Sequence, residues 1–581
     1  MKGAKLPRVL VLDGDMVPSL TVSRSLSRRG CVVDIASHTE KPLAGFSRAT
    51  NECYQYPDPL AETEAFLDWL FSHTQSNSYD LVIPVTERTL VPLSRSRERL
   101  QSVKLAMPSA DSLEVALDKA QTMALADRMG VPRPGGLLID SLDALGAAET
   151  SLRYPVVLKP ARSIGAGEKG ASQLQVGYAF NSQELRAGSA HALRFGPVLL
   201  QELFAGDGVG IELIARQGEI AYAFQHRRVH EVPLTGGGSS LRKSEAIDPQ
   251  LLEASRKLIA ELKWNGVAMV EFKQDAGTGE FSLMEINGRF WGSLPLADSA
   301  GADFPSMLLD LELNDEIVAC DPYRNDIYCR LLSRDLHWYE AVLRRDADPR
   351  IATIPSAGEI LREMSLLLSL KHRFDVQSFR DPLPGLIDVG RIIKGYYERL
   401  ATLASERAFL RAQEGAWKRG EVASAIVDAR SMLFICYGNI NRSALADVMV
   451  KAYAEDSGIG VCSAGFHEEE KRGADPVMID VAAGRGLDLS VSRSSCVSSQ
   501  MLEASDVIFV MEKVHFDRLV AMDEGIAGKV YLLGAHPGRD GKSPEIADPY
   551  GLARNHYEDC CNRIAEAVDN IKAVIAVCNG D

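Results

Sequence analysis

The sequence lacks the features of three classes of protein. Its ten cysteines show no repeated spacing and no CxxC pair, which argues against a zinc site and against a disulfide framework in a chain of 581 residues. No apolar run approaches the roughly 18 residues that a membrane helix requires. Basic residues are in deficit, with a net charge of −15, so extensive nucleic-acid binding is disfavoured. We therefore expect a soluble, cytoplasmic protein with reduced thiols and with small-molecule or protein substrates.

The pattern along the chain predicts four regions, in keeping with about 150 residues per domain. Strands alternate with helices over residues 1–110, which is typical of a doubly wound α/β domain. An α+β region over 111–312 opens with a helical stretch at 112–130. Residues 313–425 form a helical connector with a Pro-rich break, to which no chemistry can be given. Residues 426–581 return to strand–helix alternation and predict a second α/β domain with a central parallel sheet.

Two adjacent predicted strands carry acidic residues within the α+β region. VAMVEFKQD contains Glu271, and FSLMEINGRFWGS contains Glu285, Asn287 and Arg289. Residues two apart on a strand face the same side, so the last three point together and Glu271 can join them across a hairpin. Three oxygen ligands suit Mg²⁺, and Arg289 would then reach a transferred phosphoryl group. The alternative is a hairpin whose acidic outer face is simply solvated.

Three further stretches favour a nucleotide site over the solvated hairpin. YPVVLKP ends an apolar strand with Lys159, where a cation can reach phosphates. The small-residue loop ARSIGAGEKGAS (161–172) can lay backbone N–H groups over phosphates, although such a loop alone is usually a flexible connection. PVLLQELFAGD (197–207) places an acid and a glycine after an apolar strand, as an adenine-binding hinge does.

In order and spacing these pieces resemble an ATP-grasp enzyme over residues 1–312. The resemblance is to the carboxylate–amine ligases related to carbamoyl phosphate synthetase and D-alanine–D-alanine ligase. It implies an ATP-grasp fold preceded by a doubly wound domain, with ATP and Mg²⁺ (Mn²⁺ as the alternative) as cofactors. It also implies that a carboxylate is phosphorylated to an acylphosphate, which an amine or a thiol then attacks.

The resemblance assigns roles to matching residues of this sequence. Five residues bind the nucleotide, three bind the metal and one stabilises the transferring phosphoryl group: Lys119 (in LDKAQT) and Lys159 for the phosphates, Gln201, Glu202 and Leu203 for adenine, Glu271, Glu285 and Asn287 for the metal, and Arg289 for the phosphoryl group. Arg227, Arg228 and His230, in the segment 225–244 that we expect to cover the site, are candidates for holding a substrate carboxylate. A basic surface cluster is the equally good alternative for these three.

A different chemistry is indicated by ICYGNINRSALAD (435–447). Cys436 and Arg442 bracket five residues, and the pattern reads as a strand, a turn and a helix. Such a loop wraps an anion at a helix N-terminus, and the same field stabilises the thiolate of Cys436. Arg442 offers a planar fork to two phosphate oxygens, and Ser443 can donate a hydrogen bond to the thiolate. The loop between them consists of Tyr437, Gly438, Asn439, Ile440 and Asn441.

An acid that can protonate a leaving group lies far along the chain. Asp548 precedes Pro549 in PEIADPYG, in a loop that can fold over the pocket. Together with VCSAGF (461–466), GLDLSVSRS (486–494) and ASDVIFVMEK (504–513), these residues resemble a low-molecular-weight protein tyrosine phosphatase over about 430–578. The resemblance implies that Cys436 is the nucleophile, Arg442 the phosphate clamp and Asp548 the general acid and later base, without a metal.

Three positions depart from the pattern of that family. Asn441 stands where many members have a second cysteine, Ala444 replaces a common proline, and Ser492 stands where a histidine is common. None of these changes removes a catalytic group, but they leave open whether the substrate is phosphotyrosine or a phosphorylated metabolite.

The sequence as a whole predicts a bifunctional fusion of a ligase and a phosphatase. Its expected partners are small-molecule carboxylate and amine substrates and a phosphotyrosine protein or phosphorylated metabolite. Either both halves serve one pathway, or the phosphatase regulates a process to which the ligase contributes. A third hypothesis is that one of the two domains has lost its catalytic activity and only binds its ligand.

Overall fold

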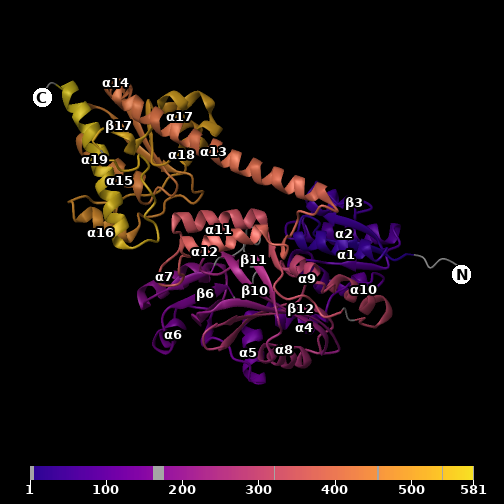
Figure 1. Ribbon diagram of the computed structural model, residues 1–581. Helices are drawn as coiled ribbons and strands as arrows, with labels where there is room; N and C mark the ends of the chain where they lie inside the picture. Colours follow the sequence, from indigo (N-terminus) through magenta and orange to yellow (C-terminus); the bar gives the residue numbers. More distant parts are fainter. Residues whose placement is uncertain (1–5, 161–175, 319–320, 455–456, 539–540, 580–581) are drawn as a thin grey trace. The chain divides into compact units, whose positions relative to one another are not determined.

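The computed structural model describes residues 6–160, 176–318, 321–454, 457–538 and 541–579. The chain divides into two compact units, Met1–Ile393 and Lys394–Asp581 (Figure 1). The glycine-rich stretch 161–172, expected to cover phosphates, lies outside the described residues.

The first unit begins with a parallel sheet in the order β3-β2-β1-β4. Alternate residues of its central strand enter two different cores, Val9 and Val11 on one face and Leu10 and Leu12 on the other. A parallel sheet that is apolar on both faces needs helices on both, which confirms the doubly wound domain. The elements are β1 (Arg8–Val11), α1 (Val17–Arg28), β2 (Val32–Ser37), β3 (Cys53–Gln55), α2 (Thr63–Ser76), β4 (Leu81–Ile83) and α3 (Glu87–Arg95).

Two largely antiparallel sheets follow in the central region. One has four strands in the order β5-β8-β6-β7, and the other has seven in the order β13-β12-β9-β10-β11-β14-β15. The strands of the smaller sheet are β5 (Gly136–Ile139), β6 (Val156–Pro160), β7 (Gly177–Ala179) and β8 (Val198–Glu202). The central strands of the larger sheet are β9 (Asp207–Arg216), β10 (Glu219–Val232), β11 (Gly238–Glu245), β12 (Gly266–Gln274) and β13 (Phe281–Asn287). Helices of this region are α6 (Leu145–Ser151), α7 (Ser182–Ala192), α8 (Pro249–Glu261), α9 (Leu294–Ala300) and α10 (Phe304–Asn314).

The helical stretch expected over 112–130 is interrupted once in the structure. The structure has two helices, α4 (Ala110–Leu117) and α5 (Lys119–Met129), separated by Asp118 in an extended conformation. The Asp118 carboxylate accepts hydrogen bonds from the N–H groups of Ala120 and Gln121 and so caps α5. This local cap competes with helix continuation and makes Lys119 the first residue of α5.

The region predicted as a helical connector also adds two strands to the seven-stranded sheet. β14 (Tyr328–Arg330) pairs antiparallel with β11, and β15 (His372–Phe374) pairs parallel with β14. The helices of the region are α11 (Leu332–Arg344), α12 (Ala357–Ser365) and the first part of α13 (Pro382–Lys418). Three-residue strands give almost no periodic signal, so their sheet partners and not their own sequence define them.

The second unit contains a parallel sheet in the order β17-β16-β18-β19, which confirms the expected α/β architecture. Its strands are β16 (Ser431–Cys436), β17 (Gly460–Gly465), β18 (Val507–Val510) and β19 (Val530–Leu532). Its helices, after the end of α13, are α14 (Glu421–Asp428), α15 (Arg442–Ala454), α16 (Pro476–Ala483), α17 (Ser499–Ala504), α18 (Lys513–Met522) and α19 (Arg554–Asn579). Among the described residues, no helix has the length and apolar character needed to cross a membrane.

A partly buried acid on α10 gives the first unit a pH-dependent stability. Burial raises the pKa of Glu312 from 4.5 to about 7, against the opposing charge of Lys104. The folded state therefore binds more protons than the unfolded state between these values, and stability falls as pH rises from 4.5 through 7. We expect Glu312→Gln to stabilise the unit by about 1–2 kcal/mol at pH 8 and much less at pH 4.5. Differential scanning calorimetry of the first unfolding transition measures this difference.

The exposed Glu316→Gln variant, just beyond the end of α10, is the matched control and should change stability little at either pH. Equal stabilisation by Glu312→Gln at both pH values would contradict the assignment of the effect to ionisation.

Candidate active sites

A cavity of about 510 Å³ in the first unit is lined by both sheets of the central region. Side chains of β6, β8, β10, β12 and β13 face it, together with Lys119 of α5 and Arg334 of α11. All nine residues that the ATP-grasp resemblance singles out line this one cavity. Its volume falls within the range of sites for small molecules.

The expected adenine hinge lies at the end of β8. Gln201 is buried, and its Nε2 has no hydrogen-bond partner among the described residues. The backbone N–H groups of Glu202 and Leu203 donate to the carbonyl oxygens of Gly135 and Pro155, at 2.8 and 3.0 Å. The hinge N–H groups are therefore engaged within the protein, and the unpaired Gln201 amide faces the cavity as a donor.

Two lysines bring positive charge into the cavity. Lys159 is held on β6, where burial and then the like charge of Lys119 lower its pKa to about 8. Lys119 stands at the N-terminus of α5, next to the cap formed by Asp118. Neither ammonium group has a hydrogen-bond or ion-pair partner within the described ranges, as expected for groups that bind phosphates.

The predicted metal ligands meet on paired strands. Glu271 of β12 lies directly opposite Glu285 of β13, and the amide of Asn287 donates to Glu285 Oε1 at 3.1 Å. Burial raises the pKa of Glu271, although Arg228 opposes this shift. Burial would also raise the pKa of Glu285, but Lys119 and the Asn287 hydrogen bond together lower it. Two closely placed carboxylates and an amide oxygen are a donor set that fits Mg²⁺.

Arginines at the same end of the cavity are paired with carboxylates. Arg228 Nη2 lies 2.5 Å from Glu271 Oε2, and Arg289 Nη2 lies 3.1 Å from Oε1 of Glu87. Glu87 is the first residue of α3 in the doubly wound domain. The N-terminal domain therefore supplies the partner that orients Arg289.

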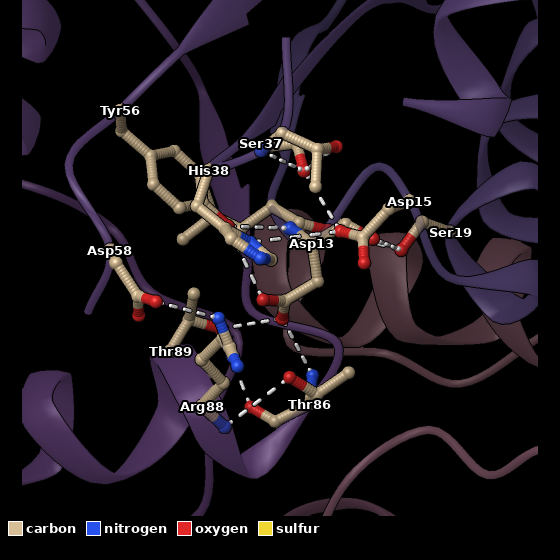
Figure 2. A network of polar contacts seen from close by, with 12 residues as sticks. Asp13, Asp15, Ser19, Ser37, His38, Tyr56, Asp58, Thr86, Arg88 and Thr89 are labelled. Atoms are coloured by element: carbon tan, nitrogen blue, oxygen red, sulfur yellow. Dashed lines mark hydrogen bonds and ion pairs between the residues drawn. The ribbon is translucent and has the colours of Figure 1, made fainter. Parts of the chain in front are cut away.

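A polar network at the carboxyl edge of the N-terminal sheet fixes the start of α3 (Figure 2). Asp13 is buried with φ = 56°, in the left-handed region. Its carboxylate accepts hydrogen bonds from the Thr86 N–H at 2.8 Å and from the Thr89 hydroxyl at 2.7 Å. Tyr56 closes the network by donating to Asp13 Oδ1 at 3.3 Å. Glu87 directly follows Thr86, so this network fixes the residue that holds Arg289.

Of the three basic residues proposed to hold a substrate carboxylate, the structure brings only Arg228 to the cavity. Arg227 points to the other face of β10 and pairs with Glu245 at 3.0 Å. His230 is buried between Asp335 and Glu363, at 2.7 and 2.8 Å, and stacks on Trp338. The hypothesis was therefore wrong for Arg227 and His230, because acidic partners elsewhere in the chain occupy both side chains.

The loop after β16 surrounds the sulfur of Cys436. Sγ is buried and accepts a hydrogen bond from the Asn439 N–H at 3.2 Å, and the Ser443 hydroxyl lies 3.0 Å away. Asn439 has φ = 52°, so the turn carries a left-handed residue at this point. Its amide donates to Ser443 Oγ at 2.9 Å and its Oδ1 accepts from the Ser495 N–H at 2.9 Å. Ser495 thus braces the loop through the side chain of Asn439.

Arg442 begins α15, and its side chain is only 1% exposed. It donates to Glu512 Oε2 at 2.5 Å, to the Ile546 carbonyl at 2.9 Å and to Asp548 Oδ2 at 2.7 Å. Burial would lower the pKa of Arg442, but the charges of Cys436 and Asp548 and the Glu512 contact raise it. Its Nε has no partner among the described residues. Three of the five guanidinium N–H groups are engaged within the described residues, so two, one of them on Nε, remain for a bound anion.

The remaining loop residues have different surroundings. The Gly438 carbonyl oxygen accepts a hydrogen bond from Arg472 Nη2 at 2.6 Å. The Ile440 carbonyl oxygen accepts one from the Asp475 N–H at 3.0 Å. Asn441 is buried, and neither polar atom of its amide has a partner among the described residues. Tyr437 is half-exposed at the rim.

Sequence reasoning missed Glu512 and Arg472 as members of this site. A signal for Glu512 was present, because it lies two residues after the end of β18, the apolar strand that runs parallel to β16. No local signal distinguishes Arg472 from other surface arginines.

Comparisons with known proteins match one stretch in each of the two units. Residues 431–577 match the family model for low molecular weight phosphotyrosine protein phosphatase, and residues 194–333 match that for ATP-grasp in the biosynthetic pathway with Ter operon. The low molecular weight protein-tyrosine-phosphatase Wzb of Escherichia coli is 35% identical over 127 residues, 22% of this chain and 82% of the relative. The probable phosphatase EpsP of Ralstonia nicotianae is 28% identical over 140 residues, 24% of this chain and 92% of the relative.

Two solved structures are similar to the first part of the chain. N5-carboxyaminoimidazole synthetase from Staphylococcus aureus is 13% identical, with a TM-score of 0.47, over 62% of this chain and 97% of that chain. L-amino acid ligase from Bacillus licheniformis is 16% identical, with a TM-score of 0.43, over 54% of this chain and 75% of that chain. At these values neither structure carries an argument about activity.

Through residues 431–577 the chain belongs to the low molecular weight phosphotyrosine protein phosphatase family, and it joins this domain to an ATP-grasp domain.

Proposed function

We propose that the chain is a bifunctional enzyme. One half is an ATP-dependent carboxylate ligase that works through an acylphosphate, and the other is a phosphomonoester hydrolase that works through a phosphocysteine. The observation that carries the proposal is the complete set of groups at each site. The nine expected ligase residues line one cavity, and Asp548 contacts Arg442 across 106 residues of sequence at the loop that holds Cys436.

In the ligase half, a substrate carboxylate oxygen attacks the γ-phosphorus of ATP. The bond to the β,γ-bridging oxygen breaks, ADP leaves, and an acylphosphate forms. Lys119 and Lys159 bind the phosphates, and Arg289 stabilises the phosphoryl group in transfer. Glu271, Glu285 and Asn287 would hold Mg²⁺ or Mn²⁺, which neutralises phosphate charge when bound. An amine or thiol then attacks the carbonyl carbon and releases inorganic phosphate.

In the phosphatase half, Cys436 Sγ attacks phosphorus and the ester P–O bond breaks. Asp548 gives its proton to the leaving oxygen, while Arg442 and the loop N–H groups hold the phosphoryl oxygens. Water then attacks the phosphocysteine, with Asp548 accepting a proton, and the thiolate is regenerated. The hydrogen bonds of Sγ with Asn439 and Ser443 support this role, because both groups can donate to a thiolate.

A phosphotyrosine side chain of a protein is the substrate that we favour for the second half. The relatives named above are protein-tyrosine-phosphatases, and the exposed aromatic rings of Tyr437 and Tyr550 at the site can flank a flat aryl phosphate. A phosphorylated metabolite remains the alternative. A second candidate function is a protein tyrosine phosphatase whose ATP-grasp half serves a separate biosynthetic step or only binds nucleotide. ATP as co-substrate and the free cysteines fit a cytoplasmic location.

Replacing the nucleophile should abolish phosphatase turnover. We expect Cys436→Ser to lower kcat for p-nitrophenyl phosphate by at least about 10³-fold, because the alkoxide is not available at neutral pH. Asp548→Asn should lower it by about 10²–10⁴-fold through loss of the general acid. Steady-state kinetics at fixed pH measures both effects.

Cys462→Ser, at an exposed position on β17, is the matched control and should keep full activity. Turnover by Cys436→Ser within tenfold of the unmodified enzyme would overturn the phosphocysteine mechanism.

Loss of a metal ligand should weaken binding of the nucleotide–metal complex. We expect Glu285→Gln to weaken Mg²⁺-ATP binding by about tenfold or more, and EDTA to have the same effect on the unmodified enzyme. Isothermal titration calorimetry measures both. Glu253→Gln, on the exposed surface of α8, should bind as the unmodified enzyme does. Unchanged affinity in Glu285→Gln would remove this residue from the metal site.

A metabolite experiment tests whether the two halves act on one molecule. Host extract is incubated with ATP, Mg²⁺ and the unmodified enzyme, Glu285→Ala or Cys436→Ser, and products are identified by mass spectrometry. If the halves act in sequence, Cys436→Ser accumulates a phosphorylated species that depends on Glu285 and that the unmodified enzyme consumes. Identical products from Cys436→Ser and the unmodified enzyme would exclude the sequential scheme for those metabolites and favour a protein substrate.

A further inference from the structure

Arg334 brings an unpaired positive charge to the ligase cavity. It is the third residue of α11 and lines the cavity beside Arg228 and the Gly236–Gly238 turn. Its guanidinium makes no hydrogen bond or ion pair within the part of the chain that the structure describes. The residue follows the stretch 194–333 that matches the ATP-grasp family model and lies in the predicted connector 313–425, to which no chemistry was assigned.

The other arginines nearby are already neutralised. Arg228 lies 2.5 Å from Glu271 and 3.0 Å from Glu231, and Arg242 lies 2.6 Å from Asp375. Burial, followed by the charges of Arg242 and Arg228, lowers the pKa of Arg334. Arg334 itself remains exposed to solvent, so its guanidinium is accessible to an anion that enters the cavity.

The backbone at the turn is shaped around this side chain. A Cβ added at Gly238 would overlap Nη1 of Arg334, so an alanine there would displace the guanidinium end of this flexible side chain from the position that it occupies. At the adjoining Gly237, the carbonyl oxygen accepts a hydrogen bond from Arg228 Nη1 at 2.9 Å. Two arginines that line the cavity therefore lie against neighbouring residues of this turn.

We propose that Arg334 binds a carboxylate of the acid substrate and that Gly238 keeps it in the binding position. A guanidinium fork matches a carboxylate in two parallel hydrogen bonds, which a lysine or a neutral amide cannot reproduce. The inference rests on the proposed ligase function and adds a specificity-determining residue to it. It replaces Arg227 and His230, whose side chains are engaged elsewhere.

The test uses succinate as the carboxylate probe and succinamide as its uncharged counterpart. Both are titrated by calorimetry into the full chain saturated with Mg²⁺-ADP, which occupies the lysines of the nucleotide end. The unmodified protein, Arg334→Gln, Arg334→Lys and Gly238→Ala are compared. Arg344→Gln, on the exposed end of the same helix, is the control.

We expect the unmodified protein and Arg344→Gln to bind succinate and not succinamide. Arg334→Gln and Gly238→Ala should bind succinate about 10- to 100-fold more weakly, and Arg334→Lys should fall between them. The affinity for Mg²⁺-ADP should change by less than about twofold in all variants, a readout that general misfolding would not preserve.

The inference would be overturned if the unmodified protein did not bind succinate, or if Arg334→Gln bound it equally well. A loss of Mg²⁺-ADP affinity in Arg334→Gln would also overturn it, by assigning the residue to the nucleotide phosphates. Failure of the unmodified protein to bind Mg²⁺-ADP would instead contradict the proposed ligase function. The same succinate titration without nucleotide then still decides the role of Arg334.

Discussion

A buried arginine must lie beside a carboxylate until an anionic ligand arrives, and this constraint shapes both sites. The Arg442 side chain is 1% exposed and contacts Glu512 and Asp548. Arg228 is 13% exposed and contacts Glu271 and Glu231. An unpaired charge at such depth would cost several kcal/mol, so each pairing holds its guanidinium in place before the substrate binds. Preorganised cations are the groups on which phosphoryl transfer depends in both proposed reactions.

In the ligase cavity this pairing connects the metal ligands with the substrate end. Glu271 is both an expected metal ligand and the partner of Arg228, so a metal ion at Glu271 competes with that guanidinium for one carboxylate. Arg228 also bonds the Gly237 carbonyl beside Arg334. Arg289 is connected in a similar way to the N-terminal domain, through Glu87 and the Asp13 network that fixes the start of α3. The doubly wound domain therefore contributes a carboxylate to the proposed active site.

In the phosphatase loop the same pairing gives Asp548 its place. The guanidinium of Arg442 reaches Asp548, which comes from a loop 106 residues further along the chain. In the proposed reaction the phosphoryl oxygens bind the guanidinium of Arg442 in place of Asp548. The Asp548 carboxyl group then faces the leaving oxygen. Asn439 contributes without touching substrate, because its amide orients Ser443 and its backbone N–H points at Sγ.

Much of the fold and many site residues could be predicted because their signals are local. Alternation along β12 and β13 put Glu271, Glu285 and Asn287 on one face, and the register of the hairpin agrees. The strand–loop–helix pattern around Cys436 likewise predicted a loop closed on the sulfur. The break at Asp118 was also local, but the capping residue lay inside a continuous helical pattern and was not recognised.

Only the tertiary structure could decide which charged residues are free and which are paired. Arg227 and His230 looked as suitable as Arg228, but Glu245, Asp335 and Glu363 occupy them, and the last two lie more than 100 residues away. Arg334 lines the ligase cavity because folding brings α11 to it. Glu512 contacts Arg442 because folding brings the end of β18 to the phosphatase loop. The sequence by itself determined the two chemistries, since each depends on residue types at short spacings. The tertiary structure determined the charge balance of each site, because electrostatic partners are chosen by distance in space and not along the chain.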